Sequence, residues 1–285
     1  MRQPACLSSA IATLAVISLS FVAAPMSLRA QADTLSPRPL FTWRDGALAA
    51  VFVVGTVAIR PLDRHYAQKL QNPRTQGNRV LHDAAIGFRT IAVPGSLIIG
   101  TTMYAAGRLS KQRKMADLGL HGTEALFVGQ GVAYVLKGIF GRARPYVDSV
   151  PNSNDWKFLR GFTGGTAYSS FPSGHTVAGF SAAAAVTSEV SRWWPRYAWV
   201  VGTTMYTGAS LVGLSRMYDN RHWASDVIMG AAIGTFAGTK VVRYHHSHPG
   251  NRIDRWLLNF SVSPGDVHSL SMSISPLPGR ARHGR

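Results

Sequence analysis

Six apolar segments follow one another along the chain and are separated by polar connections. All are rich in Ala, Gly, Val and Ile, and each is long enough for several helical turns. Small residues at this density let helices pack closely, as they do in membrane bundles. The pattern therefore predicts an all-α bundle of about six apolar helices, embedded in a membrane. The segments lie at 46–59, 90–107, 123–140, 174–190, 197–214 and 226–242.

The first segment, 46–59, is the shortest. At about 1.5 Å per residue it would reach roughly 21 Å, whereas the hydrocarbon core of a membrane measures about 30 Å. Charged residues at Arg44, Asp45 and Arg60 prevent its extension. We expect a helix packed on the outer side of the membrane, and the sequence leaves open whether it crosses.

The two ends of the chain differ from its apolar middle. A short basic start, an apolar run over 10–24 and the pattern Ala30–Gln31–Ala32 are typical of a secretory signal, with an uncleaved anchor as the alternative. Alternating polar and apolar residues around Pro264–Gly265–Asp266 predict a small β-hairpin. We therefore divide the chain into a signal or anchor at 1–32, an N-terminal segment with one short helix at 33–89, a core at 90–245, and a hairpin with a basic tail at 246–285.

Composition and charge restrict the partners. Of 285 residues, 46% are hydrophobic and only 15% are charged, against about 25% charged in soluble domains. The net charge of +17 favours an anionic partner, but no nucleic-acid-binding motif is present and we expect no nucleic acid. Cys6 is the only cysteine, which excludes an intramolecular disulfide and a cysteine metal site.

The basic connections suggest an orientation. The stretches 108–114, 192–196 and 240–255 are rich in Lys and Arg, and such loops prefer the cytoplasm. The connections 141–173 and 215–225 would then lie outside. We therefore expect an integral membrane protein of the bacterial cell envelope whose active site faces the periplasm, with a soluble periplasmic protein as the alternative.

A first block that could carry chemistry combines Lys137 with Arg144 and Pro145. Lys137 lies near the end of an apolar segment, where a buried ammonium is costly without an anion. Pro145 keeps the residue before it out of the helical conformation. Two ordinary cations at a membrane edge would produce the same pattern, so this block alone does not show whether the two residues bind an anion.

A second block, Ser173–Gly174–His175, comes directly before an apolar helical run. The free N–H groups and the dipole of a helix start attract anions. Gly174 permits close backbone approach, and His175 can exchange a proton with the same anion. The alternative is a serine cap next to a surface histidine.

The third block contains Ser215–Arg216, His222 and Asp226. His222 and Asp226 are four residues apart and would share one face of a helix. The carboxylate can accept a hydrogen bond from one ring nitrogen and leave the other unprotonated, as a nucleophilic imidazole requires. Taken alone, such a pair is more often a helix-surface pair than a catalytic one.

Together the three blocks resemble the type 2 phosphatidic acid phosphatases, which share a superfamily with bacterial class A acid phosphatases and vanadium haloperoxidases. The family pattern is K-x6-R-P, then P-S-G-H, then S-R-x5-H-x3-D, and every specified position is present. These positions are Lys137, Arg144, Pro145, Pro172, Ser173, Gly174, His175, Ser215, Arg216, His222 and Asp226.

The resemblance implies a phosphatase that needs no metal and no cofactor. His222 would attack phosphorus and form a phosphohistidine, and Asp226 would orient it. His175 would protonate the leaving oxygen and then activate water. The substrate would be a phosphomonoester or diphosphate, on a lipid or another molecule, and the oligomeric state is left open. The phosphate oxygens would be bound by Lys137, Arg144, Ser173, Gly174 and Arg216.

Three rival functions remain beside this one: a vanadium haloperoxidase, a soluble periplasmic acid phosphatase, and a non-catalytic membrane protein with an anion pocket. Residues around the motifs are given ordinary roles. Arg142, Asp219 and Arg221 are expected to be solvated loop charges. The cluster His245, His246 and His248 has some appearance of a metal site, but a basic loop after the last helix is the preferred interpretation.

Overall fold

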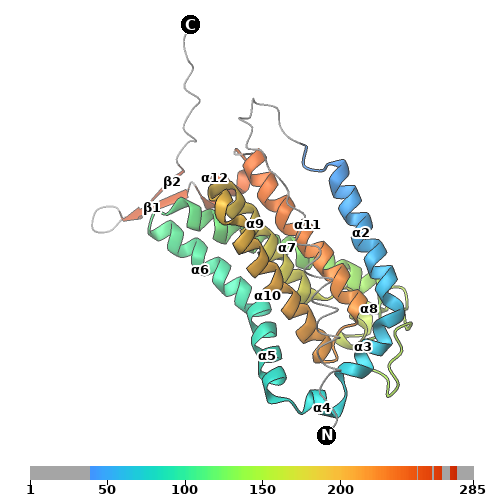
Figure 1. The fold of residues 1–285 in the computed structure, drawn as a ribbon. Coiled ribbons are helices and arrows are strands. Elements are labelled where there is room, and N and C mark those ends of the chain that lie inside the picture. The colour runs from blue at the N-terminus through green and yellow to red at the C-terminus, as the bar shows by residue number, and fades with distance from the viewer. Residues whose placement is uncertain (1–38, 249, 259, 265–269, 275–285) are drawn as a thin grey trace.

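Each of the six apolar segments forms a helix, which confirms the prediction of an all-α bundle (Figure 1). The computed structural model describes residues 39–248, 250–258, 260–264 and 270–274. The helical elements are α2 (Trp43–Ile59), η1 (Arg60–Leu62), α3 (Asp63–Leu70), α4 (Pro73–Gln76), α5 (Arg79–Thr90), η2 (Ile91–Gly95), α6 (Ser96–Leu109), α7 (Arg113–Phe140), α8 (Arg160–Thr163), η3 (Thr166–Tyr168), α9 (Gly174–Trp193), η4 (Pro195–Tyr197), α10 (Ala198–Tyr218), α11 (Ala224–Ser247) and α12 (Arg252–Leu257).

Helix α9 lies at the centre of the bundle and packs against α7, α10 and α11. A stripe of glycines on α11 makes the closest of these contacts. A Cβ at Gly230 would lie 2.7 Å from the backbone oxygen of Ser173, and one at Gly238 would lie 2.5 Å from that of Ser181. A Cβ at Gly234 would clash with the Val177 backbone oxygen in the same way. Spacing of four residues puts these glycines on one face, so the two helix backbones meet directly.

Helix α2 runs alongside α11 over most of its length, so it is not confined to one end of the bundle, as a helix on the outer side of the membrane would be. At its start, Asp45 lies 2.5 Å from the ammonium of Lys240 near the end of α11. At its end, Ile59 packs in a cluster with Ala224 at the start of α11. The helical path also continues through η1, because Arg60 keeps a helical conformation and Pro61 takes an early position of a new turn, where its missing N–H is tolerated.

The rest of the segment 33–89 also differs from the expected single short helix. Within its described part, α2 is followed by α3, α4 and α5. Helix α5 then joins α6 through η2, where Val93 leaves the helical conformation directly before Pro94. Proline disfavours the helical conformation of the residue before it, which accounts for the kink. The apolar segment expected at 90–107 is thus the second half of a longer, bent path.

Two helical stretches, Trp43–Leu70 and Arg79–Leu109, are long and apolar enough to cross a membrane by length and composition. Much of their apolar surface faces away from the bundle: the side chains of Val54 and Val57 on α2 and Ile98 on α6 are at least half exposed. Phe127 on α7 and Trp199 on α10 are also exposed. So many large exposed apolar side chains are unusual on a protein surrounded by water alone.

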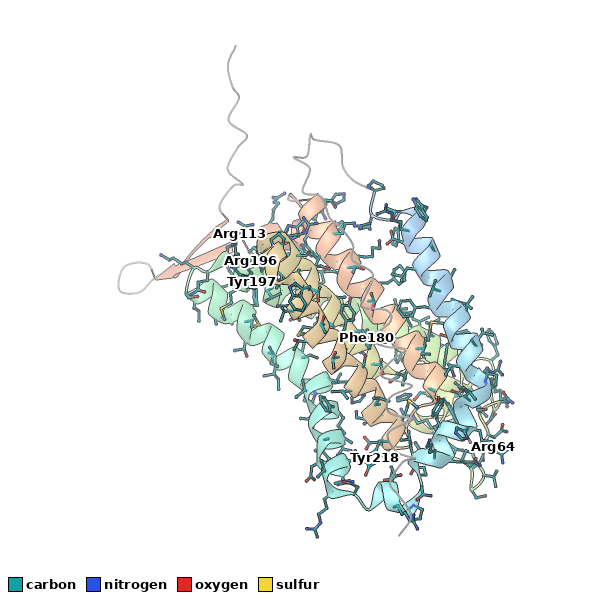
Figure 2. The ribbon with its side chains drawn as sticks, in the orientation of Figure 1. Arg64, Arg113, Phe180, Arg196, Tyr197 and Tyr218 are labelled. Atoms are coloured by element: carbon teal, nitrogen blue, oxygen red, sulfur yellow. The ribbon has the colours of Figure 1, made fainter. Side chains whose placement is uncertain are left out.

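The two ends of the bundle carry different elements. Figure 2 shows Arg113, Arg196 and Tyr197 together at one end, and Arg64 and Tyr218 at the other. Strands β1 (Phe260–Pro264) and β2 (Leu270–Ile274) pair in an antiparallel two-stranded sheet at the bundle end that carries Arg113 (Figure 1). The expected signal or anchor at 1–32 and the basic tail from Arg280 lie outside the described residues.

Candidate active site

The three sequence blocks meet at the end of the bundle opposite Arg113. Helix α7 ends just after Lys137, α9 begins at Gly174, α10 ends just after Arg216, and α11 begins just after His222. Backbone hydrogen bonds join the blocks. The N–H of Ser173 donates to the carbonyl of Asp226 over 3.0 Å, and the N–H of Ser170 donates to the carbonyl of Arg142 over 3.1 Å.

Glycine turns the chain from the first helix toward the site. Gly141 caps α7 in the left-handed conformation (φ 49°) and its N–H bonds to the carbonyl of Lys137 over 3.1 Å. Most side chains are strained at that φ, whereas glycine is not. The following residues, Arg142 to Pro145, then run along the end of the bundle and carry two arginines into it.

His222 is held by a backbone carbonyl. Its Nδ1 lies 2.7 Å from the Ser170 oxygen and 3.7 Å from Oδ2 of Asp226. Since a carbonyl can only accept, Nδ1 carries the ring proton and Nε2 carries the lone pair. The direct hydrogen-bond partner is therefore Ser170 rather than the carboxylate expected from the four-residue spacing. His222 is buried at 4% exposure.

The environment of His222 favours its neutral form. Burial lowers the pKa of the ring to about 3; the Asp226 carboxylate acts in the opposite direction, but the nearby cations of Lys137 and Arg144 add to the effect of burial. A ring with this pKa is unprotonated at neutral pH. The unprotonated Nε2 is the form that can act as a nucleophile or a base.

Asp226 joins the start of α11 to the rest of the site. Its Oδ2 accepts from the N–H of Trp223 over 2.9 Å and from the hydroxyl of Ser170 over 2.5 Å. Its Oδ1 accepts from the guanidinium of Arg142 over 2.5 Å. The carboxylate thus caps the helix and fixes the loop that holds His222.

Arg142 is fully buried, which corrects the expectation of a solvated loop charge. Its guanidinium bridges Asp226 and Asp63 of α3, the latter over 2.7 Å, and stacks between the rings of Trp156 and Trp223. Two carboxylates around one planar cation match its hydrogen-bonding geometry. Sequence reasoning missed this role because Asp63 is far away in the chain and belongs to no motif.

Cations outnumber anions at the centre of the site. The charges of Lys137, Arg144 and Arg216 act on one another and on the ring of His175. The Lys137 ammonium donates to the carbonyl of Ser169 over 2.7 Å. Three cations brought together by burial repel one another, so the site is poised to bind an anion.

Two of these cations have unused donors. The Nε atoms of Arg144 and Arg216 are buried and lack a hydrogen-bond partner among the described residues. Burial also lowers the pKa of the Arg144 guanidinium. A buried donor without a partner costs free energy, and oxygens of a bound oxyanion would satisfy both.

Asp219 forms ion pairs with Arg216 and Arg89 that the sequence did not indicate. Asp219 accepts from the guanidinium of Arg216 over 2.6 Å and lies 3.4 Å from that of Arg89 on α5. Asp219 is therefore not the solvated loop charge that was expected. Arg221 does stay exposed, and its guanidinium lies over the ring of Tyr146.

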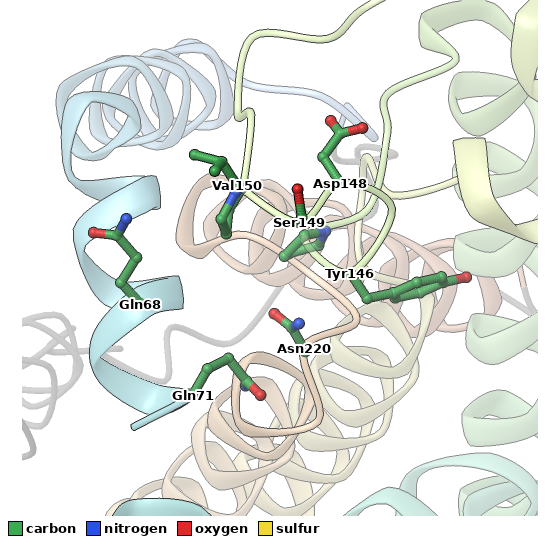
Figure 3. Close-up of a pocket in the computed structure, with 9 residues that line it drawn as sticks. Gln68, Gln71, Tyr146, Asp148, Ser149, Val150 and Asn220 are labelled. Atoms are coloured by element: carbon green, nitrogen blue, oxygen red, sulfur yellow. The ribbon is translucent and has the colours of Figure 1, made fainter. Parts of the chain in front are cut away.

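A cavity of about 420 Å³ opens next to the first block, where Pro145 lines it (Figure 3). It lies between α3 and the loop after α7, with Asn220 from the α10–α11 connection on a third side. Its size is in the range of small-molecule sites. Its lining residues are Gln68, Gln71, Pro145, Tyr146, Asp148, Ser149, Val150, Pro151 and Asn220.

Comparison with known proteins agrees with this arrangement. Residues 120–249 match the model of the PAP2 superfamily. A lipid A 1-phosphatase of Porphyromonas gingivalis is 45% identical over 87 residues, which make up 30% of this chain and 19% of that protein. A lipid A 1-phosphatase of Rhizobium johnstonii is 36% identical over 107 residues, which make up 37% of this chain and 38% of that protein. The matched part thus spans well under half of either relative.

One solved structure shares the fold. The chain superposes on a transmembrane PAP2 type phosphatidylglycerolphosphate phosphatase from Bacillus subtilis with a TM-score of 0.53 and 19% identity. The match covers 74% of this chain and 99% of that one. It extends well before residue 120, so the helices that precede the matched family model also belong to the shared fold. The part of the chain that carries the three blocks, residues 120–249, is the part that matches the PAP2 superfamily model.

Proposed function

We propose that this protein is a metal-independent phosphatase that removes a phosphate group from a membrane lipid through a phosphohistidine at His222. The observation that carries the proposal is the hydrogen bond from Nδ1 of His222 to the Ser170 carbonyl. It leaves a lone pair on Nε2 beside Lys137 and Arg144, where a phosphate would sit. A pocket that only bound anions would have no use for an oriented, neutral imidazole.

In the first step, Nε2 of His222 attacks phosphorus and the bond from phosphorus to the leaving oxygen breaks. His175 gives its proton to that oxygen, so the lipid leaves as a neutral alcohol or, from a diphosphate, as a monophosphate. Charge on the equatorial oxygens is stabilised by fixed cations. We assign that role to Lys137, Arg144, Arg216, Ser173 and the N–H of Gly174.

In the second step, water attacks the phosphohistidine. His175 now lacks a proton and accepts one from the water, while the bond from phosphorus to Nε2 breaks. Inorganic phosphate leaves and His222 returns to its neutral form. Asp226 and Ser170 position the ring in both steps, since the carboxylate binds the hydroxyl of Ser170 and the carbonyl of Ser170 binds the ring.

Exposed apolar side chains support a membrane location and disfavour the soluble periplasmic alternative. They occur on α2, α6, α7 and α10, and Figure 1 shows α2 and α6 at the edges of the bundle. A lipid substrate could then reach the site from the bilayer, and its phosphate would meet the cations at the bundle end. The relatives named lipid A 1-phosphatase make a 1-phosphate on lipid A the first substrate to test.

For the orientation we propose that the site faces the periplasm, since the connections at the opposite end, 108–114, 192–196 and 240–255, are basic. Trp43 at the start of α2 would then lie on the cytoplasmic side, because Asp45 pairs with Lys240 at that end of the bundle. Alkaline phosphatase fusions after residues 42 and 152 test this: only the second is expected to be active, and the reverse pattern would overturn the orientation.

The activity is tested by phosphate release from a panel of substrates in detergent with EDTA present. We expect release from lipid A and other lipid phosphates, and much slower release from soluble sugar phosphates. A radiolabelled lipid phosphate should leave acid-labile, base-stable label on the protein when His175 is replaced by Asn, and none when His222 is also replaced. Halide oxidation with added vanadate and peroxide would instead support a haloperoxidase.

A further inference from the structure

A second buried polar cluster lies at the opposite end of the bundle from the catalytic residues. It gathers side chains from α7, α9, α11 and α12 around a cavity of about 120 Å³. From His121 to Lys137, α7 rises about 24 Å, so the cluster is separate from the phosphate pocket. Its members are Asp117, His121, Glu124, Glu189, His245, His246 and Asp254.

The cluster overturns the expectation of a basic loop after the last helix. Helix α11 continues to Ser247, so His245 lies inside it and is buried at 2% exposure. His121 is equally buried, and the two rings stack with centroids 4.1 Å apart. Of the three histidines near the end of α11, His245, His246 and His248, only His248 lies beyond the helix, and it is exposed.

Three side chains present ligand atoms to one point. The ring nitrogens of His121 and His245 and a carboxylate oxygen of Asp254 lie within 4.8 Å of one another. Nε2 of His121 is 3.8 Å from Oδ1 of Asp254, and Nδ1 of His245 is 2.6 Å from the same oxygen. Ligand atoms around a tetrahedral zinc ion are about 3.3 Å apart, so a small movement of the Asp254 carboxylate would suit an ion.

The outer ring nitrogens are already held by carboxylates. Nδ1 of His121 lies 2.5 Å from Glu189, and Nε2 of His245 lies 2.6 Å from Glu124. This leaves the inner nitrogens, Nε2 of His121 and Nδ1 of His245, facing Asp254. A metal-binding histidine nearly always donates its other N–H to such a partner, which fixes the ring and raises its basicity.

Two atoms in the cluster have no partner. Nε2 of His121 and Oδ1 of Asp117 are both buried and lack a hydrogen bond among the described residues. Asp117 precedes His121 by four residues on α7, so both lie on one helix face and line the same cavity. A bound cation would satisfy both atoms at once, and Asp117 would supply a fourth ligand.

The charge of the cluster also calls for a cation. Four carboxylates, those of Asp117, Glu124, Glu189 and Asp254, share the cluster with three histidines and the exposed Arg113. The cluster therefore stays net negative unless all three histidines are protonated, and buried negative charge is costly. Divalent transition metals favour imidazole mixed with carboxylate.

We propose that His121, His245 and Asp254, completed by Asp117, bind one divalent transition-metal ion of the zinc type. The ion would join α7 and α11 to α12 and so hold the chain end against the bundle. On binding, it would replace the proton shared between His245 and Asp254, which would be released to solvent. The site is structural and takes no part in phosphate transfer.

The test uses full-length protein purified without a polyhistidine tag. We expect about one equivalent of bound metal by mass spectrometry, or its uptake as Zn²⁺ by protein first treated with a chelator. Added Zn²⁺ should raise the melting temperature by about 5 °C or more. Co²⁺ should give visible absorption typical of a low-symmetry nitrogen and oxygen site. The initial rate of phosphate release by the folded protein should not depend on the metal.

Matched substitutions locate the ion. His121→Gln and Asp254→Asn should lose the metal and the rise in melting temperature, whereas His248→Gln should keep both because His248 is exposed. If the first two variants do not fold, the Zn²⁺ and Co²⁺ titrations of the parent protein still decide. Less than about a tenth of an equivalent of metal, with no change in melting temperature on adding Zn²⁺, Co²⁺ or Mn²⁺, would overturn the proposal and leave only a network of protonated histidines.

Discussion

The two ends of the bundle bury polar clusters of opposite sign. At the end that carries the three blocks, Lys137, Arg144 and Arg216 converge, and two guanidinium Nε atoms lack partners among the residues that the structure describes. At the other end carboxylates outnumber the permanently charged cations, and a histidine nitrogen and a carboxylate oxygen lack partners in the described part of the chain. Buried unpaired groups cost free energy in both places.

The difference shows what each end is built to bind. The cationic cluster matches an oxyanion such as phosphate, and the anionic cluster matches a metal ion. The same helices, α7, α9 and α11, supply residues to both. A substitution at one end should therefore leave the binding behaviour of the other end intact, unless it unfolds the bundle.

The largest effect is expected from His222→Ala. Removal of the nucleophile should lower kcat by about 10⁴-fold or more, as for nucleophiles of other enzymes that form covalent intermediates. The measurement is phosphate release from a lipid phosphate. The exposed His82 gives a control, because His82→Ala should keep the parent rate. A His222→Ala protein that turns over at the parent rate would refute the nucleophile, while unchanged metal binding would confirm that the two ends act separately.

Arg142→Gln should have the next largest effect. It leaves the carboxylates of Asp63 and Asp226 buried without their cation, which costs about 3–5 kcal/mol of stability. The loop that holds His222 would shift, so kcat should fall about 10²-fold while KM changes less. Arg160→Gln serves as a control, because that arginine pairs with the partly exposed Asp155. Equal losses in both variants would show that Arg142 has no special link to the site.

A smaller effect is expected from Arg89→Gln on α5. Arg89 is partly exposed and lies 3.4 Å from Asp219, so it contributes to the charge at the rim of the site. Exposed ion pairs of this kind are worth up to about 1 kcal/mol. KM should rise about two- to fivefold with little change in kcat, measured at low salt. Arg79→Gln at the other end of α5 should change neither value.

The sequence predicted the bundle and the convergence of the three blocks because both depend on local patterns. Apolar segments define helices, and fixed spacings define the blocks at the helix ends. Residues that act through distant partners could not be found in that way. Asp63 reaches Arg142 across 79 positions, and His121 reaches Glu189 across 68. Neither pair leaves a periodic or spaced signal in the chain.

The ends of α2 and α11 show a second reason why predictions from the sequence were wrong. Arg60 looked like the limit of the first apolar segment, and the histidines after residue 244 looked like a loop. In the structure Pro61 fits an early position of a new turn, and the buried partners Glu124 and Asp254 allow His245 to stay in the helix. In both cases tertiary contacts outweighed local preference, which is how boundaries are usually misjudged.

The smallest expected change concerns pH and separates His222 from an ordinary histidine. Its pKa of about 3 means that the folded protein keeps this ring neutral when the pH falls from 7 to 5. An unperturbed histidine with a pKa of about 6.5 would be mostly protonated at pH 5, and a nucleophile of that kind would lose about 30-fold in activity. NMR of protein labelled at the histidine rings should show no titration of His222 in this range, with His222→Asn used to assign its signal.

The lowered pKa of His222 also makes the free energy of unfolding depend on pH. Below pH 6.5 the unfolded chain takes up a proton at this position and the folded chain does not until about pH 3. The unfolded state then binds more protons, so the free energy of unfolding falls as the pH drops through that window, by at most about 1.4 kcal/mol per pH unit from this group. His222→Asn should flatten that part of the profile. A titration of His222 with a midpoint near 6.5, or a profile that the variant leaves unchanged, would mean that the ring is not buried beside cations in the folded protein.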